Sequence, residues 1–216
     1  MLSERFQRIR EVLGRRQPDL TVLMDRVNKS HNFSAILRNC DAAGVLEAHV
    51  VLPEKGLPLH HGTSAGTKKW VRVRMHQTIP DAFADLRMLG FRVVAAHPSD
   101  DAIDYREFDY TQPTAILVGA ERDGVSAEGL ELADVHVSAP MQGMVRSLNV
   151  SVATSLLLFE AMRQREAAGM YAASRLSPDD FERHLFEWTW PSIASKRRRE
   201  GRPYPKLTED GDLVRD

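Results

Sequence analysis

The chain has 216 residues and a formal net charge of -1, and it is 43% hydrophobic and 27% charged. This composition suits a globular protein with a sizeable core. No apolar run approaches the ~20 residues of a membrane-spanning helix, and the charged start of the chain lacks the apolar segment of a signal peptide, so we expect a cytoplasmic protein. The single cysteine, Cys40, excludes an intrachain disulfide and a thiolate metal cage, and we expect no metal.

Apolar periodicity and stop signals predict that helices and strands alternate along the first half of the chain. Residues 4–16 carry apolar side chains at helical spacing, and residues 21–27 form an apolar, β-branched run of strand length. A helix should then begin with Asn32 or Ser34 as its N-cap, run through Ala43 and end at Gly44. The next predicted segments are a strand at 48–52, a loop at 53–69, a strand at 70–75 and a helix at 81–89.

The second half of the chain continues this alternation. We expect strands at 91–97, 114–119 and 135–139, and helices at 126–132, 149–168 and 178–188, with Asn149 able to cap the longest helix. Residues 195–206 are basic, contain prolines and should be poorly ordered until a partner binds. Because several strands are apolar throughout, the fold class should be α/β, with a mostly parallel sheet and helices on both faces.

Basic residues crowd both ends of the chain although the net charge is near zero. Clustered cations attract phosphates whatever the total charge, so the two ends are candidate RNA-binding segments. The alternative is a solvated terminal helix and a loose basic tail. The candidate RNA-binding residues are Arg8, Arg15, Arg16, Arg197, Arg198 and Arg199.

Common nucleotide and metal motifs are absent from the sequence. The segment GAERDGVS has the glycine spacing of a P-loop but lacks the lysine that must follow, and no GxGxxG follows a predicted strand. The adjacent pair His60 and His61 lies in a loop with no nearby carboxylate, which favours a polar loop over a metal site. Cys40 lies within a predicted helix and is more typical of a small buried residue than of a nucleophile.

Three polar segments remain, and each follows a predicted strand, where ligands of parallel α/β folds bind. They are HNFSAILRNCDAAG at 31–44, LVGAERDGVS at 117–126 and PMQGMVRSLNVSVA at 140–153. Taken singly, each is explained by ordinary structure: a helix cap with a surface arginine, a turn, and a capped apolar loop. Ser34 and Arg38 are four residues apart, so they share one face of their helix.

Together, in this order and spacing, the three segments resemble the motifs of the TrmH-type branch of the SPOUT methyltransferases. The resemblance runs from about Arg15, beginning with RRQPDLTV, to Tyr171 in AAGMY, and it is closest to the tRNA guanosine 2′-O-methyltransferases. It implies an α/β fold with a C-terminal trefoil knot, a homodimer, and methyl transfer from S-adenosylmethionine to the 2′-oxygen of guanosine 18 in the tRNA D-loop. The chain then divides into an N-terminal basic helix at 1–20, a catalytic domain at 21–170 and a C-terminal basic extension at 171–216.

The resemblance also implies roles for individual positions. The sequence departs from the family pattern at several positions. Asn28 and Ser30 stand where histidine and proline are common, and Ala96 stands where threonine is frequent. Ala139 replaces a larger aliphatic residue, and Arg146 stands where glutamine is common. The implied catalytic residues are Asn32, Arg38, Glu121, Ser147 and Asn149. The implied S-adenosylmethionine-binding residues are Ala96, Gly119, Ala139, Met144 and Leu148.

The role of Arg38 stays open at the level of sequence. The family counterpart is credited with activating the 2′-hydroxyl, but keeping an arginine neutral at pH 7 costs roughly 7–9 kcal/mol. Gripping a phosphate and stabilising alkoxide character is the alternative. Two other functions also remain open: a ribosomal RNA 2′-O-methyltransferase, and a non-catalytic RNA-binding protein with this fold. Only about 20 residues precede the first predicted strand, which favours tRNA because ribosomal RNA relatives often carry a leading RNA-binding domain.

Overall fold

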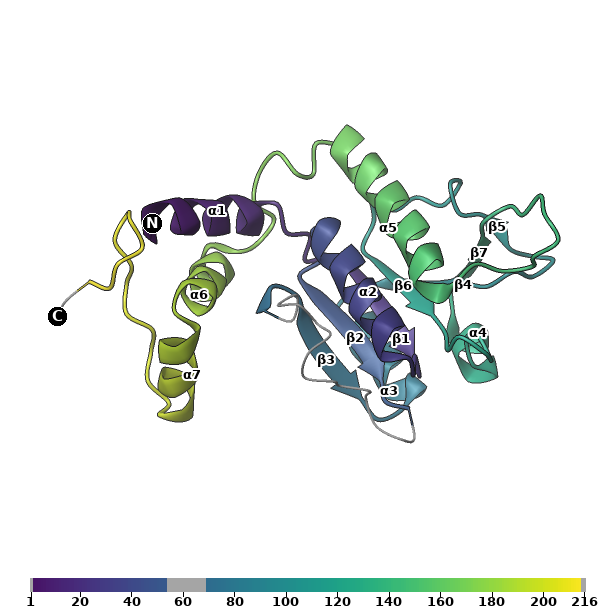
Figure 1. Ribbon diagram of the computed structural model, residues 1–216, viewed down its shortest axis with the longest axis horizontal. Coiled ribbons are helices and arrows are strands. Elements are labelled where there is room, and N and C mark those ends of the chain that lie inside the picture. Colours follow the sequence, from purple (N-terminus) through teal and green to yellow (C-terminus); the bar gives the residue numbers. More distant parts are fainter. Residues whose placement is uncertain (1, 54–68, 215–216) are drawn as a thin grey trace. The chain divides into compact units, whose positions relative to one another are not determined.

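The computed structural model of the chain describes residues 2–53 and 69–214 (Figure 1). Within them the chain forms two compact units: a central unit of residues 18–169, and a terminal unit that joins residues 1–17 to 170–216. The predicted loop at 53–69 and the pair His60 and His61 lie almost entirely outside the described residues.

The central unit is built on a parallel sheet. In the described residues it has seven strands in the order β3-β2-β1-β6-β4-β7-β5. Every pairing between neighbouring strands is parallel, which confirms the predicted α/β class. The strands are β1 (Leu20–Asp25), β2 (Glu47–Val51), β3 (Arg72–His76), β4 (Arg92–Ala96), β5 (Ile103–Asp104), β6 (Thr114–Val118) and β7 (Val135–Ser138).

Helices cover both faces of this sheet, because its central strands are apolar on both sides and must be kept from water. On one face α2 (Ser30–Ala42) packs beside α5 (Val150–Ala167), as Figure 1 shows, and their side chains share one core cluster with alternate residues of β1 and β6. On the other face α3 (Ile79–Met88) and α4 (Ala127–Leu132) enclose the second core cluster around Phe83 and Leu117.

A buried arginine fastens the C-terminal half of α5 to the sheet. The Arg165 side chain is fully buried, and its Nη1 donates to Asp19 Oδ1 at 2.6 Å. Its other nitrogens donate to the backbone carbonyls of Tyr110, Gln112 and Asp19 at 2.9–3.0 Å. A buried cation is tolerated when its donors are satisfied in this way, so Arg165 fixes α5 against the chain segments that lead into β1 and β6.

The start of α2 differs from the sequence prediction. Asn32 and Ser34 were expected to cap this helix, but it begins at Ser30, with Lys29 in the capping position and no side-chain hydrogen bond there. Asn32 therefore lies inside the first turn, and its amide is available for other contacts. At the other end Gly44 has a positive φ of 81°, as expected for a residue that ends a helix.

The terminal unit contains α1 (Leu2–Gly14), α6 (Pro178–Thr189) and α7 (Pro191–Arg199), with α1 packed on α6. Residues 195–206 were expected to be poorly ordered, but α7 extends through Arg199, and Arg198 Nη2 donates to Glu187 Oε1 at 2.7 Å. The aromatic ring of Tyr204 stacks on Phe186 with centroids 4.6 Å apart. The tail after α7 is thus held against α6. In the described part of the chain, no helix is long and apolar enough to cross a membrane.

Candidate active site

A pocket of about 500 Å³ lies beyond the carboxyl ends of the parallel strands, where such folds bind ligands. Its volume falls in the range of small-molecule sites, roughly 300–1,000 Å³. The loops that follow β1, β4, β6 and β7 all contribute to it, together with the start of α5. Its apolar lining residues include Ala96, Val137, Ala139, Leu148 and Leu157.

The loop after β6 is folded tightly enough that only glycine fits at its first position. Ala120 and Gly124 exchange two backbone hydrogen bonds of 2.9 Å, which folds the segment back on itself. A Cβ on Gly119 would lie 1.9–2.0 Å from backbone atoms of Gly124 and Val125. Glycine at position 119 is therefore required for the turn that carries Glu121 to the pocket.

A buried aspartate holds the far end of the same loop. Asp25, the last residue of β1, is 1% exposed, and its Oδ2 accepts from the Ser126 backbone amide at 2.8 Å. Ser126 in turn caps α4, its hydroxyl accepting from the Gly129 amide at 3.2 Å. The loop 119–126 is thus fixed at both ends. The sequence reasoning missed Asp25, although an acidic residue that ends an otherwise apolar strand is a usable signal.

Three of the predicted catalytic side chains form one hydrogen-bonded chain. Asn32 Nδ2 donates to Glu121 Oε1 at 2.7 Å, and Asn149 Nδ2 donates to Asn32 Oδ1 at 3.1 Å. Asn149 Oδ1 then accepts from the backbone amide of Ser151 at 2.8 Å and from its hydroxyl at 2.6 Å. A carboxylate can only accept, so Glu121 fixes the orientation of the Asn32 amide, which in turn fixes that of Asn149. The chain joins α2, the β6–α4 loop and the N-terminus of α5.

The negative charge of Glu121 keeps this series of hydrogen-bonded side chains in one arrangement. Partial burial would raise the pKa of its carboxyl, but the hydrogen bonds from Asn32 and from the backbone around Asn28 and Lys29 outweigh that effect and lower it. The Lys29 amide donates to Glu121 Oε1 at 3.2 Å. Glu121 is therefore an acceptor at neutral pH, and the site holds a fixed negative charge.

The structure brings most of the predicted site residues to this pocket. It is lined by Ala96, Gly119, Ala139 and Leu148 from the cofactor set and by Glu121, Ser147 and Asn149 from the catalytic set. Asn32 is 2% exposed and reaches the pocket through Glu121 and Asn149.

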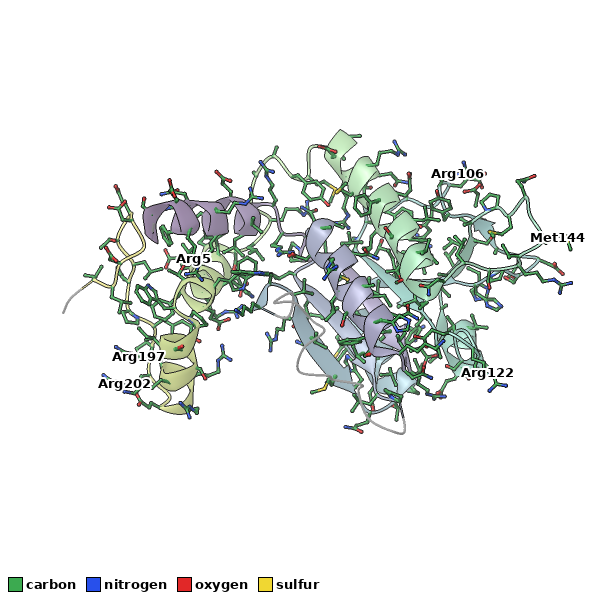
Figure 2. The ribbon with its side chains drawn as sticks, in the orientation of Figure 1. Arg5, Arg106, Arg122, Met144, Arg197 and Arg202 are labelled. Carbon is green, nitrogen blue, oxygen red and sulfur yellow. The ribbon has the colours of Figure 1, made fainter. Side chains whose placement is uncertain are left out.

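Two predicted residues lie elsewhere. Met144 does not line the pocket, its side chain is 99% exposed, and Figure 2 shows it at the outer edge of the central unit. Arg38 lies on the exposed face of α2, does not line the pocket, and has no hydrogen bond or ion pair to any described residue. Their cofactor and catalytic roles remain predictions.

Four of the six candidate RNA-binding residues of the terminal unit are exposed, and Arg16 is a correction. Arg16 is fully buried, and its guanidinium lies over the ring of Trp188 at 5.1 Å, so it is a packing residue and leaves the candidate RNA surface. Arg8 and Arg15 are exposed, as are Arg198 and Arg199, whereas Arg197 is half-buried.

The pocket also carries charged residues that the sequence reasoning did not select. Lys29, Arg122 and Asp123 line it together with Arg146. Their signal was present in the sequence, because each lies in a loop directly after a predicted strand. Among the described residues no group of three or more His, Cys, Asp or Glu side chains is arranged to hold a metal ion.

The site and the fold together define a methyltransferase of the SpoU class. Residues 19–159 match the SpoU rRNA Methylase family, and residues 163–216 match the family described as SpoU, rRNA methylase, C-terminal. The chain belongs to this family, which confirms the resemblance found in the sequence.

The chain is also similar to individual enzymes and to a solved structure. The chain is 49% identical over 218 residues to the tRNA (guanosine(18)-2′-O)-methyltransferase of Escherichia coli, a match that covers 100% of this chain and 95% of the relative. It is 55% identical over 184 residues to the enzyme of that name from Thermus thermophilus, covering 85% of this chain and 95% of the relative. Among solved structures, the A. aeolicus TrmH/SpoU tRNA modifying enzyme has a TM-score of 0.82 and 42% identity, covering 89% of this chain and 98% of that one.

Proposed function

We propose that this chain transfers a methyl group from S-adenosylmethionine to the ribose 2′-oxygen of guanosine 18 in the D-loop of tRNA. The observation that carries the proposal is the full-length match to a tRNA (guanosine(18)-2′-O)-methyltransferase, which covers the terminal unit as well as the pocket. A match confined to the central unit would support methyl transfer without indicating the RNA.

The pocket fits S-adenosylmethionine by its size and by the chemistry of its lining. Ala96, Val137 and Leu148 offer apolar walls suited to an adenine ring, and the Glu121 carboxylate offers a negative charge near a cationic ligand. A related structure is the SpoU methyltransferase AviRb of Streptomyces viridochromogenes in complex with AdoMet, with 29% identity and a TM-score of 0.62 over 70% of this chain and 62% of that one. Ala96, Gly119, Ala139 and Leu148 would hold the methyl donor, with Met144 closing over it from the loop 139–149.

The methyl donor supplies an electrophilic methyl group on sulfur, which requires no metal. The protein must then hold the ribose oxygen in line with that group and stabilise the charge that develops on the oxygen. Asn32 and Asn149 are held rigidly by Glu121 and by the N-terminus of α5, so they can orient the ribose. Ser147 is exposed in the pocket-lining loop and would contact the ribose or the donor.

Under this proposal Arg38 has an electrostatic role in the reaction. Its side chain is exposed on α2, where a guanidinium can grip a substrate phosphate and stabilise alkoxide character on the 2′-oxygen. Its neighbour Asn39 donates to the Ser151 carbonyl at 2.8 Å, which ties this part of α2 to the start of α5. Arg38 is thereby carried on a rigid element.

The wider assembly is also part of the proposal. Val152, Leu156 and Phe159 are 48%, 36% and 43% exposed and lie at helical spacing on one face of α5. An exposed apolar stripe is typical of a protein contact, and we assign it to a homodimer, which light scattering would test. The tRNA surface would include Arg8, Arg15, Arg197, Arg198 and Arg199. The loop 139–149 would form part of a trefoil knot. The protein would work in the cytoplasm.

A ribosomal RNA substrate is the second candidate, favoured by the name of the matched family, which specifies rRNA. One experiment separates the candidates. Transcribed tRNA, the same tRNA with guanosine 18 replaced, and a ribosomal RNA fragment are incubated with protein and labelled methyl donor. Labelling of the first RNA alone supports the proposal. Labelling mainly of the ribosomal fragment, or labelling of tRNA that persists without guanosine 18, contradicts it, and no labelling of any RNA favours a non-catalytic RNA-binding protein.

A further inference from the structure

Three of the residues that line the pocket are cationic, and they come from three separate loops. Lys29 precedes α2 in the loop after β1, Arg122 lies in the loop after β6, and Arg146 lies in the loop after β7. All three line the pocket and all three are exposed. Because each comes from the carboxyl end of a different parallel strand, the cations approach the pocket from several sides.

These cations form no hydrogen bonds or ion pairs with the described part of the protein. Within the described residues the side chains of Lys29, Arg122 and Arg146 have no hydrogen bond and no ion pair, whereas Arg106 and Arg163 are paired with carboxylates of their own segments. The pocket-lining carboxylate of Glu121 forms no ion pair with them: it accepts from Asn32 and from the backbone of the β1–α2 loop. Exposed Asp123 is the one remaining pocket-lining carboxylate in the described part of the chain.

We propose that Arg146, together with Arg122 and Lys29, binds the phosphates that flank the target ribose and so positions the RNA strand over the pocket. This inference rests on the proposed function, because it concerns the RNA of that reaction. A ribose that enters the pocket carries a phosphate on each side, and those phosphates must lie at its rim. Unpaired, exposed guanidinium groups are suited to that contact, since they bind phosphate oxygens with two parallel hydrogen bonds.

The alternative ligand for these cations is the carboxylate of the methyl donor. Exposure favours the RNA phosphates: Arg122 and Arg146 are at the solvent side of the pocket, and Figure 2 shows the Arg122 side chain directed outward from the central unit. Phosphate contacts position a nucleic acid without reading its sequence. The phosphate clamp formed by Lys29, Arg122 and Arg146 therefore acts on RNA affinity and on KM for RNA, and leaves base identity to other residues.

The test compares Arg146→Gln and Arg122→Gln with the wild-type protein and with Arg92→Gln as a matched control. Arg92 is exposed but begins β4, at the opposite, amino-terminal edge of the sheet. For each protein, tRNA binding is measured from low to moderate salt, S-adenosylmethionine binding by calorimetry, and methylation under steady-state conditions.

Each pocket variant should weaken tRNA binding about tenfold and reduce the slope of log K against log salt by about 0.7–0.9, the value expected when one phosphate is no longer neutralised. KM for tRNA should rise, with kcat and S-adenosylmethionine affinity changed less than about twofold. Asp123→Asn should act in the opposite direction and tighten tRNA binding. The control should match the wild type.

Three results overturn the inference. If the wild type methylates tRNA but Arg146→Gln and Arg122→Gln bind it as the wild type does, the clamp is wrong and the proposed function stands. If these variants lose affinity for S-adenosylmethionine rather than for tRNA, the cations bind the donor carboxylate. A wild type that neither binds nor methylates tRNA removes the proposed function and the clamp with it.

Discussion

Asn149 donates a hydrogen bond from Nδ2 to Oδ1 of Asn32 at 3.1 Å, across 117 residues of sequence. The same Asn149 caps α5 through its Oδ1, which accepts from the Ser151 amide at 2.8 Å. One side chain therefore serves a helix and a candidate active site at once. The two roles use different atoms of the amide, so they can be separated by substitution.

Asn149→Asp should separate them. The aspartate keeps an oxygen to cap α5, but it replaces the donor to Asn32 by a second acceptor. We expect the α5 cap to be kept, since Asn and Asp are about equal as N-caps. The free energy of unfolding should fall by about 1–3 kcal/mol, because the buried Asn32 Oδ1 loses its donor, and methyl transfer should fall by at least about tenfold. Asn149→Ala should lose both roles and cost about 1 kcal/mol more, through the lost cap. Urea unfolding and single-turnover methylation measure the two effects. Full activity of the aspartate variant would show that the Asn32 contact is unimportant.

Arg38→Ala should abolish methyl transfer and leave S-adenosylmethionine binding within a few fold, because Arg38 does not line the pocket. Arg38→Lys keeps the charge but not the forked geometry, and it should recover part of the activity if the role is electrostatic. Calorimetry measures donor binding, and a single-turnover assay on tRNA measures transfer. Substantial activity in the alanine variant would remove Arg38 from the mechanism.

The sequence predicted the sheet and the pocket-lining segments because those depend on local signals. The apolar runs at 114–118 and 92–96 form β6 and β4, and the polar segments that follow them line the pocket. The two-residue β5 gives no such signal, since two residues carry no periodicity. The prediction for Arg16 was also wrong. Its charge indicated an RNA contact, but its burial over Trp188 depends on a segment about 170 residues away. Long-range packing of this kind overrides local composition.

Gly119→Ala should disrupt the pocket. A Cβ at this position would lie 1.9–2.0 Å from the backbone of Gly124 and Val125, so the loop that carries Glu121 must move. We expect S-adenosylmethionine binding to weaken by at least about tenfold, with a loss of stability of about 1–3 kcal/mol. The matched control is Gly143→Ala, in the loop before α5, where a Cβ meets nothing within 4 Å. Calorimetry and thermal unfolding should separate the two variants. Equal behaviour would show that the β6–α4 loop rearranges without penalty.

Stability should depend on pH through a buried histidine pair. His49 Nδ1 and His76 Nε2 are 2.9 Å apart, and burial, then the charge of His76, lower the pKa of His49 from 6.5 to about 4. Arg74, Glu47 and Asp85 also face the pair. The folded protein thus binds this proton less readily than the unfolded chain does, so the contribution to stability is complete above pH 6.5 and is lost as the pH falls towards 4. At about 1.36 kcal/mol per pH unit, the loss reaches up to about 3 kcal/mol.

Urea unfolding between about pH 4 and pH 7 measures this dependence. His49→Gln should flatten the curve in part over that range, whatever its stability at neutral pH, because it removes one of the two histidines whose pKa burial lowers. His31→Gln, which changes an exposed histidine on α2, should leave the curve as in the wild type. A wild-type curve that stays level throughout this range would contradict the assignment.

The basic residues of α7 should contribute unequally to tRNA binding. Arg198 Nη2 donates to Glu187 Oε1 at 2.7 Å, so part of its charge is already offset, whereas Arg199 is exposed and has no pairing with a described residue. Arg197→Gln with Arg199→Gln should therefore weaken tRNA binding and reduce the salt slope by about 0.7–0.9 for each phosphate that is no longer neutralised. Arg198→Gln should reduce that slope less but lower the melting temperature more, because Arg198 also reaches Tyr204 and holds the tail on α6. Filter binding at several salt concentrations and circular dichroism measure the two effects. An unchanged slope in the double variant, with α7 still folded, would mean that these cations are solvated and that tRNA is bound by other residues.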